Sequence, residues 1–328
     1  MLGECLVDLA PAPPEQAHEV GKRYVALPGG GPANVAVGLA RLGVRAAFAG
    51  RFAGEGFGPW LRDNLVANGV DLSPSVEAGQ PATLAVVTLD GEGRASYGFY
   101  GPETADWQWS LSELPDPTGR FAAVHTGSLA TTFEPSASVL AEWLEGLRGA
   151  GEVVVSFDPN VRPGLVTDLD AYRGRLQKLA SFAHVVKASD EDIAAVYPGS
   201  SVESVAGSWL SGGATVVFVT EGALGARAFH ESGARAQCAP PAVEVVDTIG
   251  AGDAFSSGFL SHLGSAGALS PAGLRSLGPS ELAAVLSEAV AASAFTCTRP
   301  GADPPTAAEL ARFCETTCAG SPPPAASG

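Results

Sequence analysis

Two glycine-rich stretches hold the residues of this chain that could do chemistry, GGGPAN at 29–34 and GAGD at 250–253. Each stands at the start of a helical pattern. A helix N-terminus leaves backbone N–H groups free and carries about half a positive charge. Glycine residues let an anion approach that backbone closely. We therefore expect GAGD to hold an anion, with the carboxylate of Asp253 beside it.

Asp253 has two explanations. A carboxylate next to a bound phosphoryl group could take the proton of an attacking hydroxyl, and phosphoryl transfer needs mainly positioning, charge neutralisation and one such base. An aspartate in the first turn of a helix is also favoured by the helix dipole alone. In the other stretch, Asn34 could bind a polyol because its amide both donates and accepts hydrogen bonds, and Asp8 could accept from the same hydroxyls.

The elements that must position these residues alternate along the chain. Short β-branched runs predict strands at 153–157, 184–188, 216–220 and 243–247. Helical patterns separate such runs; another, at 33–43, ends at Gly43. This alternation predicts βαβ units and a mostly parallel sheet of the α/β class. The first strand, within LGECLV near the start, is very short.

Two segments, 9–28 and 80–105, have extended rather than helical patterns. DGEG at 90–93 lies between two strand-like halves, which indicates a hairpin. We expect the two segments to form a small β-sheet lid. The sequence then divides into that lid, an α/β core and a small-residue, proline-rich tail expected to be disordered. The core is expected to comprise 1–8, 29–79 and 106–318, and the tail 319–328.

Polar residues follow the apolar runs, at the edge where open α/β sheets bind ligands. They include Asp8, Asp158, Lys187, Thr220 and Asp247. One polar residue at a strand end is common in any fold, but five of them indicate one shared crevice. Neither a GxxxxGK[ST] loop nor a GxGxxG motif after a first strand is found, which disfavours a Walker-type site and an NAD-dependent dehydrogenase.

Composition narrows the classes of partner. The chain has 328 residues, of which 46% are hydrophobic, and a net charge of −16. That charge argues against a nucleic-acid partner, whereas a small anion needs only local amides and a cation or two. No apolar run reaches the roughly 18 residues of a membrane span, and no signal peptide is visible, so we expect a cytoplasmic protein without a membrane partner. Five scattered cysteines and the absence of HxH or HExxH make a zinc site or a disulfide framework unexpected.

With these motifs identified, the chain resembles the PfkB carbohydrate kinase family, also called ribokinase-like. GGGPANVAVGLARLG (29–43) is similar to its amino-terminal signature and DTIGAGDAFSSGFL (247–260) to its carboxyl-terminal one. The resemblance covers nearly the whole chain. It implies a doubly wound sheet with helices on both faces and a β-lid that closes over a sugar and forms a homodimer contact. It also implies ATP and Mg²⁺ as cofactors, with K⁺ as a further candidate.

The resemblance assigns roles to single residues. Asp253 matches the catalytic base, and the anion hole matches the amides of Gly250, Ala251 and Gly252. The sugar site matches Asp8, Gly30, Asn34 and Arg162. The residues expected on the nucleotide side are Lys187, Ser189, Thr220, Gly222 and Gly225. Ser189 and Asp192 replace an Asn-x-x-Glu motif, so Asp192 is expected to reach Mg²⁺ through water. Asp247 and Ile249 match a monovalent-cation loop, whose second half resembles TRPGAD at 298–303.

The substrate is the least defined part of the resemblance. GECLVD, GGxPAN and DPNxR look most like fructokinases, which implies ATP-dependent phosphorylation of a primary sugar hydroxyl, with fructose O6 as the first choice. A 2-keto-3-deoxygluconate kinase, a ribokinase and a nucleoside kinase stay open as alternatives. A catalytically silent sugar- or nucleotide-binding regulator is an alternative of another class, and the intact Asp253 favours the enzyme.

Overall fold

A computed structural model describes residues 1–12, 21–89, 95–101 and 103–318. Its central six-stranded sheet has the order β12-β11-β10-β9-β8-β7. The strands are β7 (Ala123–Gly127), β8 (Val154–Asp158), β9 (Val185–Ser189), β10 (Val216–Thr220), β11 (Ala226–His230) and β12 (Arg235–Cys238). Neighbours from β7 to β10 run parallel, and β11 and β12 are antiparallel additions. The strands predicted at 153–157, 184–188 and 216–220 are confirmed.

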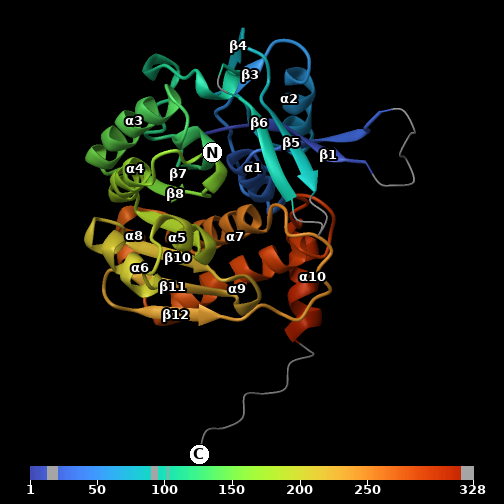
Figure 1. Ribbon diagram of the computed structural model, residues 1–328. Helices are drawn as coiled ribbons and strands as arrows, with labels where there is room; N and C mark the ends of the chain where they lie inside the picture. Colours follow the sequence, from blue (N-terminus) through green and yellow to red (C-terminus); the bar gives the residue numbers. More distant parts are fainter. Residues whose placement is uncertain (13–20, 90–94, 102, 319–328) are drawn as a thin grey trace, which may run out of the picture.

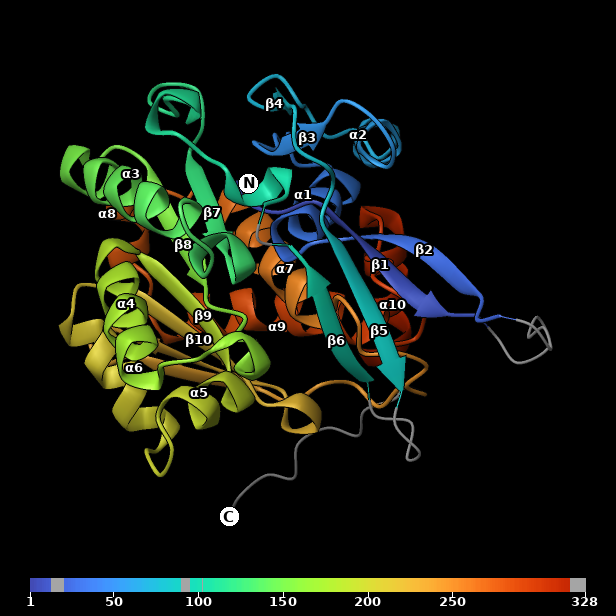
Figure 2. The same cartoon turned by 45° about the horizontal axis from the view of Figure 1, so that its top comes forward.

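Helices cover both faces of this sheet (Figures 1 and 2). One face carries α3 (Ser136–Ala150), α4 (Leu169–Phe182), α5 (Asp190–Val196) and α6 (Val202–Ser211). The other carries α1 (Gly31–Arg41), α7 (Ala251–Ser265), α8 (Pro271–Arg275) and α9 (Pro279–Thr296). Val154 and Val155 point to opposite faces and are both fully buried, which explains the continuous apolar run of β8. The predicted doubly wound α/β fold is confirmed.

A second sheet of four strands lies beside the core (Figure 1), in the order β2-β1-β5-β6. Its strands are β1 (Leu6–Pro11), β2 (Tyr24–Gly29), β5 (Leu84–Leu89) and β6 (Ala95–Tyr100). Strand β1 pairs antiparallel with β2 and parallel with β5, and β5 pairs antiparallel with β6. These strands come from the two segments predicted to form the lid. The DGEG turn and the tail 319–328 lie outside the described residues.

The start of the chain contributes to both sheets. The N–H of Leu2 donates to His125 O on β7 (2.9 Å), and Leu2 forms a parallel bridge with Ala49. From Leu6 onward the chain pairs within the second sheet. The expected core segment 1–8 therefore includes the first three residues of strand β1. Along the chain between β2 and β5 also lie the short paired strands β3 (Arg51–Ala53) and β4 (Val76–Ala78), and helix α2 (Gly58–Ala67).

The prediction of a strand at 243–247 is wrong, because these residues form an irregular connection between β12 and α7. Val245 and Val246 are 60% and 59% exposed. Since the sheet ends at β12, these β-branched residues have no strand to pair with, and the N–H groups of Val246 and Asp247 donate to Cys297 O instead (2.8 and 3.3 Å). After α9, helix α10 (Ala307–Cys318) packs through Leu310. Among the described residues, no helix is both long and apolar enough to span a membrane.

Candidate active site

Helices α1 and α7 bring the two glycine-rich stretches together. The Asn34 side chain, in the first turn of α1, donates from Nδ2 to Asp253 Oδ2 (2.8 Å). A Cβ atom at Gly38 would lie 2.5 Å from Ser257 Oγ, so only glycine permits this close approach of the two helices. The predicted base and the predicted sugar-binding amide therefore face each other across one helix contact.

Asp253 faces a small cavity that also reaches the ends of strands β7 and β8. The lining residues are Gly31, Pro32, His125, Gly127, Ser128, Asp158, Asn160 and Asp253. Asp253 is 9% exposed. Burial raises the pKa of its carboxyl to about 7, the Asn34 hydrogen bond opposes that rise, and the charge of Asp158 adds to it. A base with a pKa near the working pH is well suited to take a proton from a hydroxyl.

The turn before α7 has the shape expected of an anion site. Gly250 adopts a left-handed conformation (φ 74°), and a Cβ atom there would lie 2.6 Å from the Cβ of Ala302. No side chain caps the N-terminus of α7. A Cβ atom at Gly252 would lie 2.9 Å from Lys187 Nζ, so an ammonium group stands beside the turn. The N–H of Ala251, one of the three predicted anion-hole amides, donates to Thr248 O (3.2 Å), and the cation stands beside Gly252, next to Asp253.

Lys187 is held there by a buried ion pair. Its Nζ lies 2.8 Å from Asp158 Oδ2, and the two residues are 3% and 4% exposed. Burial lowers the pKa of Lys187, but the carboxylates of Asp158, Asp192 and Asp253 outweigh it and raise the pKa above its usual value. Lys187 therefore stays cationic at neutral pH, and removing one member of such a pair is strongly destabilising.

Ser189 and Asp192 hold each other at the N-terminus of α5. Ser189 Oγ accepts from the N–H of Asp192 (3.0 Å), and Asp192 Oδ2 accepts from the N–H of Ser189 (2.8 Å). Asp192 Oδ1 accepts from the N–H of Val161 (2.7 Å). Both carboxylate oxygens thus bind backbone, and a role on Mg²⁺ stays a prediction. No group of three or more His, Cys, Asp or Glu side chains in the described chain could hold a metal ion by itself.

The residues predicted to bind sugar come from three elements. Asp8, on β1, is half-buried and lies against Gly29, where a Cβ atom would overlap with its Oδ2. Burial raises the pKa of Asp8 to about 6, and the charge of Arg162 opposes this. Arg162 Nη1 donates to Asn160 Oδ1 (2.6 Å) in the loop after β8. Gly30 has φ 108°, and a Cβ atom there would overlap with a backbone carbonyl.

The residues predicted on the nucleotide side lie at the same edge of the sheet. Thr220 ends β10 and is in register with Ser189 at the end of β9. Gly222 and Gly225 have positive φ angles of 52° and 94° in the turn that leads to β11. A Cβ atom at Gly225 would overlap with the carbonyl of Cys238, so this turn requires glycine. Their contact with a nucleotide stays a prediction.

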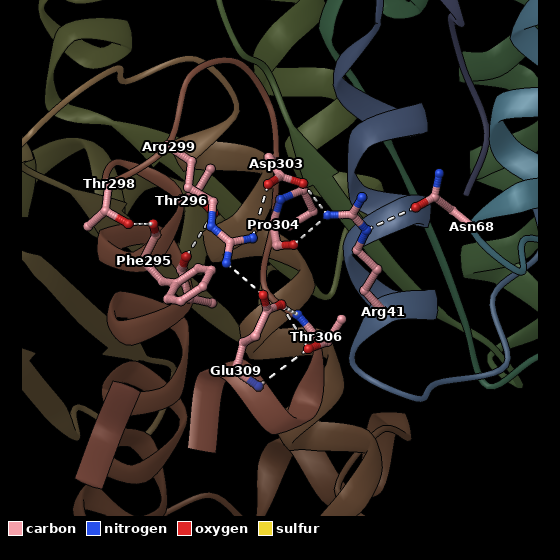
Figure 3. A network of polar contacts seen from close by, with 11 residues as sticks. Arg41, Asn68, Phe295, Thr296, Thr298, Arg299, Asp303, Pro304, Thr306 and Glu309 are labelled. Atoms are coloured by element: carbon pink, nitrogen blue, oxygen red, sulfur yellow. Dashed lines mark hydrogen bonds and ion pairs between the residues drawn. The ribbon is translucent and has the colours of Figure 1, made fainter. Parts of the chain in front are cut away.

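The predicted cation loop is tied to the α7 turn. Asp247 accepts from the N–H groups of Ile249 (Oδ1, 3.0 Å) and Gly301 (Oδ2, 2.8 Å). Figure 3 shows how the following loop is held: Asp303 lies between the guanidinium groups of Arg41 and Arg299. The two arginines also bind further groups, namely Pro304 O, Asn68 and Glu309. A cation at Asp247 and Ile249 stays a prediction.

The sequence matches the pfkB family of carbohydrate kinases over residues 1–309. The chain belongs to this family. A fructokinase from Rhizobium leguminosarum bv. trifolii is 34% identical over 80% of this chain and 78% of its own. The crystal structure of a Xylella fastidiosa fructokinase with bound ATP has a TM-score of 0.85 and 29% identity, covering 97% of this chain and 98% of that chain.

A second pfkB-like structure is a Vibrio cholerae O395 fructokinase with bound fructose, ADP and calcium ion. Its TM-score is 0.79 at 28% identity, and the match covers 97% of this chain and 97% of that chain. The enzyme class expected from the sequence, a phosphotransferase with an alcohol group as acceptor, is confirmed.

The end of strand β7 contributes residues to this site that the sequence patterns did not predict. Ser128 has a positive φ of 55° and lines the cavity next to Gly31. A Cβ atom at Gly127 would overlap with the carbonyl of Asp158, so this glycine lets β7 and β8 end close together. The run AVHTG (123–127) has few β-branched residues, so its pattern does not predict a strand. The polar residue that follows it, Ser128, is the signal that could have indicated a strand end. A larger, mostly apolar cavity between β7 and residues 44–49 does not reach Asp253.

Proposed function

We propose that this protein is an ATP-dependent kinase for a primary hydroxyl of a sugar, with fructose converted to fructose 6-phosphate. The observation that carries the proposal is the placement of Asp253, whose carboxyl with its pKa near 7 lies between the Asn34 amide and the glycine turn of α7. The fructokinase relatives, one with bound ATP and one with fructose and ADP, support the choice of substrate.

On the acceptor side, Asp8, Asn34 and Arg162 would bind the sugar hydroxyls, since they supply an acceptor, an amide and a cation, and the charge of Arg162 lowers the pKa of both Asp8 and Asp253. The reacting hydroxyl would lie against Asp253. Its oxygen attacks the γ-phosphorus as its proton passes to the Asp253 carboxylate, and the bond from that phosphorus to the bridging oxygen of ADP breaks. Holding both reactants in place contributes much of the rate, as in other phosphoryl transfers.

On the phosphate side, the amides of Gly250, Ala251 and Gly252 would receive the transferring group. The Lys187 ammonium beside Gly252 would neutralise charge on the phosphates. Asp192 would reach Mg²⁺ through water, because both of its carboxylate oxygens already accept from backbone N–H groups and protein-bound Mg²⁺ usually keeps several waters. When bound, Mg²⁺ supplies further neutralisation of phosphate charge. K⁺ would lie at the loop of Asp247 and Ile249.

The four-stranded sheet would act as a lid that excludes water, which competes with the sugar as phosphoryl acceptor. We further propose that the lid forms a homodimer contact. Several large apolar side chains of this sheet are exposed to solvent: Tyr24, Val25, Leu27 and Tyr100. Tyr24 and Tyr100 lie on one face of the sheet and Val25 and Leu27 on the other, and exposed apolar side chains of this size are common at protein interfaces.

The test is ADP release with ATP and one of five acceptors: fructose, ribose, 2-keto-3-deoxygluconate, inosine or adenosine. We expect the largest kcat/KM with fructose, and we expect Asp253→Asn to abolish the signal while keeping the melting temperature. A larger kcat/KM with another acceptor would replace fructose and keep the kinase. Release with none of them, together with thermal stabilisation by sugar or nucleotide, would favour the silent regulator instead.

A further inference from the structure

The four-stranded sheet meets the core where three strands leave or re-enter it, and one buried carboxylate joins all three places. Strand β1 leaves after Cys5, β5 leaves after Thr83, and β6 returns through Gly101 and Thr104. Cys5, Thr83 and Thr104 are all buried. Asp106, in the short helical turn that follows, is 1% exposed and lies among them.

Each carboxylate oxygen of Asp106 accepts a hydrogen bond from the residue that directly precedes a different strand. Oδ1 accepts from the N–H of Cys5 (2.9 Å), and Oδ2 accepts from the hydroxyl of Thr83 (2.6 Å). The Thr83 hydroxyl also contacts the hydroxyl of Thr104, which in turn donates to Gly101 O (2.7 Å). One side chain thus fixes the bases of β1, β5 and β6 relative to one another.

The Asp106 segment is itself anchored to the core. Arg51, which is 7% exposed, donates from Nε to Ala105 O (3.1 Å), and the N–H of Ala105 donates to Pro81 O (2.9 Å). The next residues inward, Trp107 and Trp109, are 0% and 2% exposed. The contacts of Asp106 therefore connect a fixed part of the core to the strands of the lid.

We propose that Asp106 is a positioning residue of the acceptor site, acting through β1 on Asp8. Asp8 lies three residues beyond Cys5, and the intervening Val7 donates its N–H to Thr83 O (3.0 Å), so the Asp106 contacts set the path of β1 up to the predicted sugar ligand. This inference rests on the proposed function, because it assigns Asp8 to the sugar.

The cost of burying Asp106 argues that the carboxylate does more than fill space. It has no ion-pair partner among the described residues, and Glu4, another buried carboxylate, is close enough to interact unfavourably with it. Burial raises the pKa of Asp106 to about 7, opposed by the bonds from Thr83 and Cys5. An apolar side chain would avoid that cost but could not bind two strands at once.

The test compares KM for fructose with KM for ATP in Asp106→Ala, Asp106→Asn and Leu179→Ala. Leu179 is a buried residue of α4 and packs against the face of the six-stranded sheet that α3 to α6 cover. Its truncation therefore lowers the stability of the protein without removing a contact of the four-stranded sheet. We expect Asp106→Ala to raise KM for fructose at least tenfold with KM for ATP changed less than twofold. Asp106→Asn, which can still accept from Cys5 N and donate to Thr83, should recover most of the loss. Equal changes in both KM values, or a pattern like that of Leu179→Ala, would overturn the inference.

A second measurement separates this inference from the proposed function. If the wild type phosphorylates no acceptor, the function fails, and amide hydrogen exchange still tests the role of Asp106 in the lid. We expect faster exchange in 6–11 and 84–89 of Asp106→Ala than in wild type, with 154–158 and 185–189 unchanged. Unchanged exchange in the lid, or equal acceleration throughout, would contradict it. If Asp106→Ala does not fold, Thr83→Val replaces it in both measurements and is expected to show the same KM split.

Discussion

Helices α1 and α7 of this pfkB-family kinase both begin at a glycine-rich turn, residues 29–34 and 250–253, and we call each turn the opening of its helix. Different chemical groups surround the two openings. The chain enters α1 from strand β2 of the four-stranded sheet, whereas it enters α7 from an irregular, exposed connection. The opening of α1 presents Gly31 and the amide of Asn34. The opening of α7 presents Asp253, with the ammonium of Lys187 beside Gly252. The side chains of the first opening itself are therefore uncharged, with the Asp8 carboxyl against its Gly29, whereas the second opening carries a carboxyl and has an ammonium beside it.

This difference indicates a division of labour. A neutral amide suits the hydroxyls of a sugar, while a cation beside a helix N-terminus that no side chain caps suits a phosphoryl group. Asp253 lies where the two meet, because it accepts from Asn34 and belongs to α7. If this division holds, substitutions should impair the two openings separately.

The largest expected effect is on kcat, and it should distinguish a variant of Asp253 from a variant of Asn34. Replacement of Asp253 by asparagine removes the base, and we expect kcat to fall about 10²–10⁴-fold. Asn34→Ala removes a hydrogen bond to the base and a sugar contact, and should cost only about tenfold, mainly in KM for the sugar. Steady-state kinetics measure both. Comparable losses in kcat for the two variants would remove the distinction between the openings.

The pH dependence of kcat/KM for the sugar tests the same carboxylate. Because the pKa of Asp253 is raised to about 7, it is protonated and inactive as a base at lower pH. We expect kcat/KM to rise roughly tenfold per pH unit from pH 5 and to level off near pH 7. A profile that is flat from pH 5 to 8 would show that no base of this pKa is required.

A matched pair of glycine substitutions should affect opposite substrates. A Cβ atom at Gly31 would lie 3.2 Å from Asn160 Nδ2 and 3.3 Å from Asp253 Oδ1, so Gly31→Ala narrows the acceptor side. A Cβ atom at Gly252 would press on Lys187 Nζ, so Gly252→Ala disturbs the phosphate side. We expect about tenfold increases in KM for sugar and for ATP, respectively, from about 1–2 kcal/mol of overpacking. The same KM rising in both variants would contradict the division.

The smallest effect is expected at the loop behind α7. Asp303→Asn weakens the half-exposed network with Arg41 and Arg299 shown in Figure 3. Surface ion pairs are worth about 0–1 kcal/mol, so kcat should change less than about threefold. Thermal unfolding provides the matched control for stability. A loss as large as that of Asp253→Asn would mean that the loop acts directly in catalysis.

The sequence was informative where local chemistry decides structure. Helix openings at glycine turns and buried strands such as Val154–Asp158 follow from local patterns, and the predicted fold is confirmed. The prediction of a strand at 243–247 was wrong because β-propensity does not indicate that the sheet already ends at β12. Ser128 and the pairing of Lys187 with Asp158 were missed because they depend on which strand ends become neighbours. The burial that shifts the pKa of Asp253 depends on the same long-range packing.

The central claim is that the protein transfers the γ-phosphoryl group of ATP to fructose. The most direct test uses ³¹P NMR to monitor that group in a mixture of ATP, Mg²⁺, fructose and the protein. We predict that the ATP signals convert to those of ADP and a single fructose phosphomonoester at O6. The Asp253→Asn protein, folded to the same melting temperature or higher, should leave ATP unchanged over the same time. Formation of the sugar phosphate by that variant at the wild-type rate, or ADP with inorganic phosphate and no sugar phosphate from the wild type, would contradict the account.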